Sequence, residues 1–208
     1  MKYTLDFSPK VDVSAPAVSG ALVGAQPQPA FVAWQPSTWP MATASVNEDF
    51  ICTLKRIFEE SILGEISNVI DDALAVHGDL QHRGHVVAIS LMCALDAISS
   101  YGYGRKSGKQ IPPFILAHFP SEYHPHANEI RDVYRNTLVH SWNLFEAAIY
   151  PDKTAVKSEN GTIGFGLLNF FQALVQGTEN FLEELAHNGT LQKNSLQRYR
   201  QLRGTAKP

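Results

Sequence analysis

Apolar residues recur at the spacing of an α-helix over most of this chain, and this periodicity limits the fold more than any other feature of the sequence. The first such stretch contains Phe50, Leu54, Ile57, Phe58, Ile62, Ile66, Val69, Ile70 and Leu74. Asn47, followed by two acids, is typical of a helix start because its side chain can cap the first turn. His77 and Gly78 are typical of a helix end. The pattern predicts a helix from Asn47 to His77.

A second helix is expected from Leu80 to Tyr101. Its centre, VVAISLMCALDAIS, is almost entirely apolar and contains one charged residue, Asp96. Such a helix is typically buried at the centre of a fold. A carboxylate in that position needs a partner, because an unpaired buried charge is costly. No apolar run approaches the length of a membrane span.

The later elements predict an all-α fold with one small β-hairpin. A short helix is expected from Phe114 to Phe119, and Pro125 suits the first turn of a further helix that reaches about Ala148. Alternating residues flank Asn160-Gly161, a strong signal for a hairpin turn. The segment from Leu167 to His187 is again amphipathic, so the hairpin should precede the last long helix.

The two ends of the chain differ in composition from the helical region. Residues 1–46 contain Pro9, Pro16, Pro27, Pro29, Pro36 and Pro40. No helix tolerates that density of proline, so an irregular arm is expected. Trp34 and Trp39 indicate that part of the arm packs on the domain or on a partner. Residues 190–208 hold five basic residues and no acid, which predicts a basic tail after a helical domain at 47–189.

Charge and cysteine content narrow the function and the setting. The net charge is −3, so any contact with nucleic acid must use a local basic patch. Charged residues make up only 18 %, which leaves apolar surface for a partner subunit. The two cysteines fit neither a disulfide framework nor a zinc site. We expect a cytoplasmic protein without a signal peptide, a metal or a cofactor.

The stretch YRNTLVHSWN carries three polar residues that a plain amphipathic helix does not need: Arg135, Asn136 and His140. On a helical wheel, Asp132, Asn136 and His140 line one flank of the apolar stripe, while Arg131 and Arg135 line the other. Arg135 and His140 are therefore about 140° apart on an ideal helix.

Two arrangements would bring Arg135 and His140 together. The helix could distort near His140, or two copies could pack about a two-fold axis and bury Val139 and Trp142. Such a pair suits metal-free cleavage of a phosphodiester. Histidine moves protons near neutral pH, and arginine binds the phosphate with two parallel hydrogen bonds. Asn136 could orient the histidine or contact the phosphate.

The stretch IRDVYRNTLVHSWN resembles the signature of the HEPN superfamily, in which an arginine, a polar residue and, a few residues later, a histidine lie late in a core helix. The segments ALDAISSYGYG and FILAHFPSEYHPHA, and a hairpin followed by a final helix, extend the resemblance over about Asn47–Ala186. The resemblance implies an up-and-down helical bundle that dimerises through the motif face.

Many members of this superfamily are metal-independent ribonucleases of toxin–antitoxin, abortive-infection or other defence systems, and some only bind nucleotides or assemble with other proteins. Carried to this chain, the resemblance makes Arg135 and His140 the catalytic pair and Asn136 their polar companion. It makes Asp96 a supporting acid from a preceding helix, although a purely structural bond explains Asp96 as well. An RNA substrate and an antitoxin or other protein partner are the implied ligands.

Other residues carry weaker indications. Tyr101, Tyr103, Arg105 and Lys106 could stack on bases and hold phosphate, or form an ordinary connection between helices. The histidine pairs His82/His85 and His124/His126 lack further ligands and are expected to be surface or capping residues. Two other functions stay open: a catalytically inactive binding module, and a scaffold in which Arg135 pairs with Asp132 or Glu146 for stability.

Overall fold

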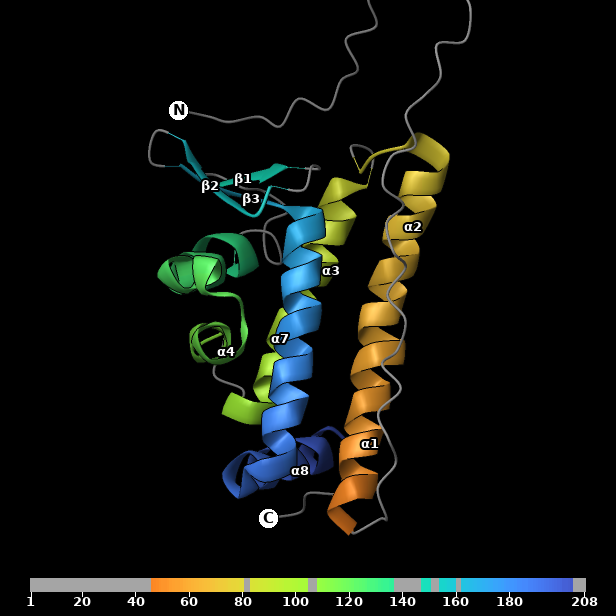
Figure 1. Cartoon of the computed structure of the whole chain (residues 1–208), viewed down its shortest axis with the longest axis vertical. Helices are drawn as coiled ribbons and strands as arrows, with labels where there is room; N and C mark the ends of the chain where they lie inside the picture. The colour runs from red at the N-terminus through yellow and green to blue at the C-terminus, as the bar shows by residue number, and fades with distance from the viewer. Residues whose placement is uncertain are drawn as a thin grey trace, which may run out of the picture.

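The computed structural model describes residues 46–80, 83–104, 108–136, 147–150, 154–159 and 162–203. This part of the chain is mostly helical, and a small three-stranded sheet precedes the last two helices (Figure 1). The expected mainly helical fold with a small β element before the last long helix is therefore confirmed. The expected arm lies outside the described residues, and the domain boundaries stay predictions.

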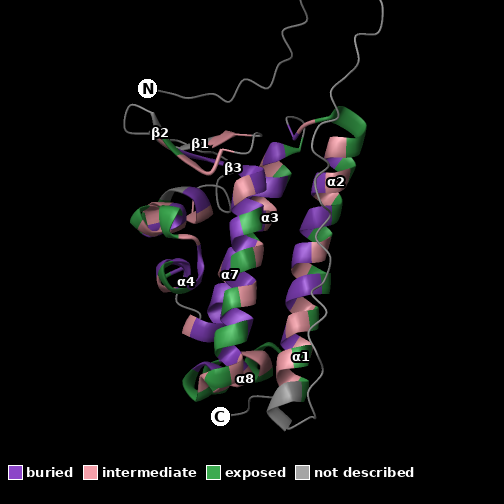
Figure 2. Ribbon diagram, in the orientation of Figure 1, coloured by how far each residue is buried: buried purple, intermediate pink, exposed green. Residues whose placement is uncertain are grey.

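The first predicted helix is present, with one irregularity. Helix α1 (Val46–Phe58) passes through a π-helical turn at Glu59–Gly64 into α2 (Glu65–His77), and Gly78 ends it at a φ of 74°. The buried apolar residues of α1, the turn and α2 are Leu54, Phe58, Leu63, Ile66, Ile70 and Ala73. Phe58 and Leu63 are five positions apart, a spacing that the wider π-helical turn accommodates. The turn thus keeps both apolar stripes on the core side (Figure 2).

Helix α3 (Gly84–Tyr103) is the central helix that its apolar sequence predicts. It contacts α2, α4 (Ile111–His118), α7 (Leu167–His187) and α8 (Gly189–Leu202). Within the described residues, α3 is the one helix long and apolar enough to cross a membrane, contrary to the expectation from the sequence. Most of it is buried by these neighbouring helices (Figure 2), as the core helix of a globular fold would be.

The sheet has the order β1-β3-β2, formed by Ala147–Tyr150, Val156–Glu159 and Thr162–Gly166. β2 and β3 are antiparallel with Glu159 opposite Thr162, so the hairpin predicted at Asn160-Gly161 is confirmed. β1 pairs parallel with β3, which contradicts the expected helix as far as Ala148. Ile149 and Tyr150 favour strands, and pairing with β3 outweighs the helical pattern here.

The segment that carries the motif is less regular than a single helix from Pro125. A 3₁₀ helix at Ser121–His126 contains Pro125, α5 follows at Ala127–Glu129, and a π-helix spans Ile130–Arg135. Pro125 therefore lies inside the 3₁₀ helix and does not start an α-helix. Tyr134 anchors the segment to the sheet, because its hydroxyl donates to the carbonyl of Ile163 at 2.6 Å. Its ring also packs at 4.1 Å from that of Phe165.

Helix α8 forms from the basic C-terminal segment and packs against α3. Asn188 caps it by accepting hydrogen bonds from the backbone N–H groups of Thr190 and Leu191. Leu191 is buried, and Asn194 donates to the carbonyl of Gly102 at 3.1 Å. The segment expected as a basic tail therefore forms a helix up to Leu202, with one face fixed to the central helix.

Candidate functional site

The Asp96 cluster comprises Asp96, Gln110, Arg135 and Asn136, which come from three separate segments. Asp96 accepts a hydrogen bond from Gln110 at 2.6 Å through Oδ1. Its other oxygen, Oδ2, lies 3.3 Å from Nη2 of Arg135. Nη1 of Arg135 donates to Oδ1 of Asn136 at 3.0 Å. Asp96 of α3 therefore has two partners, the side-chain amide of Gln110 and the guanidinium of Arg135. The ion pair with Arg135 joins the motif segment to the central helix.

The cluster is partly shielded from solvent. The side chain of Arg135 is 15 % exposed and that of Asp96 is 28 % exposed. At this intermediate depth the ion pair is stronger than a fully exposed one, and both side chains keep some contact with solvent.

The turn before α4 completes the cluster. Gly108 has a φ of 83°, and a Cβ atom there would lie 3.4 Å from Cγ of Arg131 and 3.5 Å from Cδ of Arg135. Glycine therefore satisfies a left-handed backbone and a close approach to both arginine stems at once. Gln110, two residues later, is buried and directs its amide at Asp96.

Arg131 and Asp132 form a separate ion pair on the surface. Nε and Nη2 of Arg131 each donate to a carboxylate oxygen of Asp132 at 2.6 Å. The hydrogen bonds from Arg131 hold the pKa of Asp132 below its usual value. In the scaffold reading Arg135 pairs with Asp132 or Glu146. The structure pairs Arg135 with Asp96 and Asp132 with Arg131, while Glu146 lies outside the described residues.

Several of the residues singled out from the sequence lie outside the described residues, among them His140, Val139, Trp142, Arg105 and Lys106. The relation between Arg135 and His140 therefore stays a prediction, as does burial of Val139 and Trp142 between two copies. The structure does bring together Arg135, Asn136 and Asp96. Arg131 and Asp132 lie on the same π-helix but pair with each other.

Tyr101 and Tyr103, the two tyrosines that could stack on RNA bases, contact other residues of the protein. Tyr101 is 6 % exposed and packs against the ring of Phe58 at 5.1 Å, so it offers no open face to a base. The Tyr103 hydroxyl lies 3.1 Å from Nε2 of His118. His118, which the sequence did not single out, is 2 % exposed and lies 3.9 Å from Glu184. Burial lowers the pKa of His118, and the Glu184 carboxylate opposes this shift.

The described part of the chain holds no group of three or more His, Cys, Asp and Glu side chains that could bind a metal ion. Of the histidine pairs noted in the sequence, His124 lies 3.0 Å from the carbonyl oxygen of Phe119, in keeping with a capping role. His82 lies outside the described residues.

Comparisons with known protein families, curated proteins and solved structures each found no match. The resemblance of the motif to the HEPN signature accordingly stays a prediction from the sequence.

Proposed function

We propose that this chain is a metal-independent endoribonuclease of the HEPN type, with Arg135 and His140 as its catalytic residues. The observation that carries the proposal is the fixed position of Arg135. A surface arginine of no function needs no anchor, whereas this one is held by Asp96 and donates to the next motif residue, Asn136. The π-helix that ends at Arg135 adds support, because such distortions are frequent at functional sites.

In the proposed reaction, His140 removes the proton from a ribose 2′-hydroxyl. The 2′-oxygen then attacks the adjacent phosphorus, and the bond to the 5′-oxygen breaks as that oxygen gains a proton. Arg135 binds the phosphate and offsets the charge that develops on its oxygens. The products are a 2′,3′-cyclic phosphate and a 5′-hydroxyl. Asp96 and Gln110 act as positioning residues, because Asp96 contacts Arg135 and Gln110 contacts Asp96.

The proposed active form is a homodimer in which Arg135 of one copy meets His140 of the other, with Val139 and Trp142 at the interface. Arg135 and His140 lie on opposite flanks of an ideal helix, so a two-fold axis would bring an arginine of one copy beside a histidine of the other. Control of cell growth or defence against phage, restrained by an antitoxin or another protein partner, is the biological role that such an activity would serve.

The test is cleavage of mixed single-stranded RNA in EDTA by wild-type protein, Arg135→Ala and His140→Ala. Matched controls are Arg56→Ala in α1 and His187→Ala in α7, which remove the same side-chain types at exposed positions. Cleavage is expected in the wild type and both controls and should be lost in the two motif variants. Full activity in folded His140→Ala would refute the proposal.

A second candidate is a catalytically inactive module that binds a nucleotide, RNA or a protein. The ion pair itself favours it, since Asp96 already neutralises much of the charge that Arg135 would offer to a phosphate. Absence of cleavage at high protein concentration, together with RNA binding that Arg135→Ala weakens, would select this function over the ribonuclease.

A further inference from the structure

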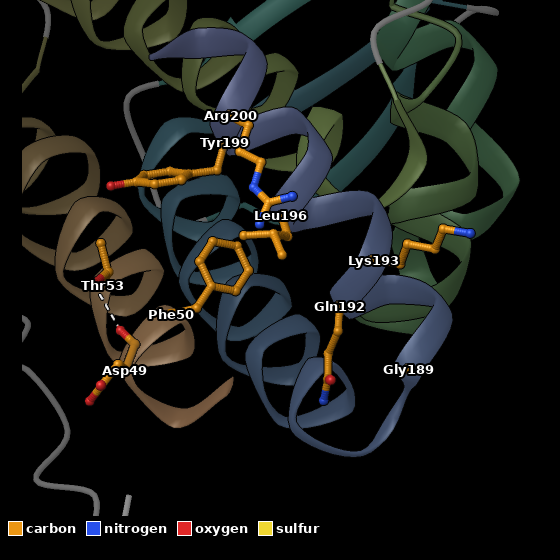
Figure 3. A pocket seen from close by; sticks show the side chains of 9 residues that line it. All are labelled: Asp49, Phe50, Thr53, Gly189, Gln192, Lys193, Leu196, Tyr199 and Arg200. Atoms are coloured by element: carbon orange, nitrogen blue, oxygen red, sulfur yellow. Dashed lines mark hydrogen bonds between the residues drawn. The ribbon is translucent and has the colours of Figure 1, made fainter. Parts of the chain in front are cut away.

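A groove of about 580 Å³ lies between the start of α1 and the outer face of α8 (Figure 3). Its apolar floor is formed by Phe50 of α1 and by Leu196 and Tyr199 of α8. The rings of Phe50 and Tyr199 meet edge to face at 5.6 Å. Lys193 and Arg200 line the groove from α8, and Asp49 lines it from α1. An apolar floor between charged side chains is typical of a site that receives a peptide segment.

The chain itself supplies a segment of matching character directly before the groove. Helix α1 begins at Val46, and its fifth residue, Phe50, is already part of the floor. Residues 13–45 contain no Asp, Glu, Lys, Arg or His. Within them, FVAWQPSTWP (Phe31–Pro40) contains three aromatic and two proline residues. An uncharged stretch this rich in aromatic residues differs from segments that stay solvated, which carry net charge and few aromatics.

We propose that the groove between α1 and α8 is the docking site for Phe31–Pro40 of the same chain. Proline-rich segments bind aromatic-lined grooves in an extended form, because they lose little conformational entropy on binding. Trp34 or Trp39 packs on the ring of Phe50, within reach of the Arg200 guanidinium, which favours an aromatic face.

The length of the connection permits this docking. Trp39 and Val46 are seven positions apart, so the connection between them spans up to about 23 Å when extended. The groove runs along α8 from Gly189 to Arg200, which is about 18 Å of helix. The segment can therefore reach any part of the groove, and its attachment to α1 gives it a high effective concentration there.

The proposal is tested on the full chain labelled with 5-fluorotryptophan. Trp34→Phe and Trp39→Phe assign the fluorine signals, and the change in shift between H₂O and D₂O reports solvent contact of each indole. In wild-type protein the signal of Trp34 or Trp39 should show little solvent effect. Leu196→Lys, which places a charge on the apolar floor, should restore the full effect of an exposed indole.

Leu202→Lys is the matched control, because Leu202 lies on the same helix, is 54 % exposed and is not part of the groove. It should leave both signals unchanged. Equal responses to the two substitutions, or full solvent contact of both indoles in the wild type, would overturn the proposal. Circular dichroism confirms that each variant retains its helices.

A mixing experiment distinguishes docking of the segment within one chain from docking between two copies of the chain. Labelled Leu196→Lys protein, with a blocked groove, is added to unlabelled protein that carries Trp34→Ala and Trp39→Ala and has an open groove. Docking within one chain predicts no change in the labelled signals. A shift of either signal would show docking between copies and overturn the assignment to the same chain.

Discussion

Nη2 of Arg135 lies 3.3 Å from Oδ2 of Asp96, so an ion pair connects the segment with the motif to the centre of α3. The two residues are 39 positions apart, and neither is fully exposed. The pair therefore has two roles: it gives the buried helix a partner for its only charge, and it fixes the side chain on which the proposed reaction depends.

Asp96→Ala should destabilise the protein, because it leaves a partly buried guanidinium without its carboxylate. The expected loss is about 1–3 kcal/mol in the free energy of unfolding, measured by urea denaturation. Asp132→Ala is the control, since that pair is exposed and should change stability by less than about 1 kcal/mol. Equal losses in the free energy of unfolding would show that the Asp96–Arg135 pair stabilises the fold no more than the exposed pair does.

Gly108→Ala should disturb Arg135 as well as the backbone. Its positive φ costs any other residue about 1–2 kcal/mol, and the added methyl group contacts the stems of Arg131 and Arg135. Gly78→Ala is the matched control, because Gly78 has a similar φ of 74° but nothing within 4 Å. RNA cleavage should fall in Gly108→Ala and persist in Gly78→Ala, whereas thermal stability should fall in both. A normal cleavage rate in Gly108→Ala would show that the turn at Gly108 does not help to position Arg135.

Mixing inactive Arg135→Ala with inactive His140→Ala should restore cleavage if the site is shared between copies. Half of the dimers then combine both variants, and each holds one intact site, so the mixture should reach about a quarter of wild-type activity. The measurement is the initial rate of RNA cleavage after the two proteins are equilibrated together. A mixture as inactive as its components would place Arg135 and His140 of one site in the same chain.

Stability should fall as the solution becomes acidic because of His118. Burial lowers the pKa of this histidine in the folded protein below its usual 6.5, so the unfolded chain binds the proton more readily. The contribution of neutral His118 is fully present above about pH 6.5 and is lost as the pH falls from there towards the lower, folded-state pKa. His118→Gln should flatten the pH dependence of the free energy of unfolding in that range. His187→Gln, at an exposed position, should leave it unchanged.

Elements defined by local pattern could be predicted from the sequence. Helix α7 has the bounds that its amphipathic pattern indicates, and the Asn160-Gly161 signal identifies the β2–β3 hairpin. Both depend on residues close together in the chain, for which spacing and turn chemistry suffice. The same holds for the end of the first long helix at Gly78.

The features that define the candidate site depend on distant parts of the chain. Strand β1 exists because β3 pairs with it, although its own residues continue a helical pattern. The need of Asp96 for a partner could be predicted, but its partners Gln110 and Arg135 could not, because no periodicity connects α3 with residues beyond the following loop. Tyr101 could have stacked on a base from the connection between helices, yet the last turn of α3 buries it against Phe58.

The contacts of Tyr134 with Ile163 and Phe165 have a consequence for the order of synthesis. The motif leaves the ribosome about thirty residues before the strand that anchors it. Until β3 emerges, the segment around Arg135 lacks both its hydrogen bond to the sheet and the ring on which it packs. Nascent chains that stop before Phe165 should therefore contain the residues of the site without a rigid frame for them. If the chain is a ribonuclease, its activity should appear only after β3 has emerged from the ribosome.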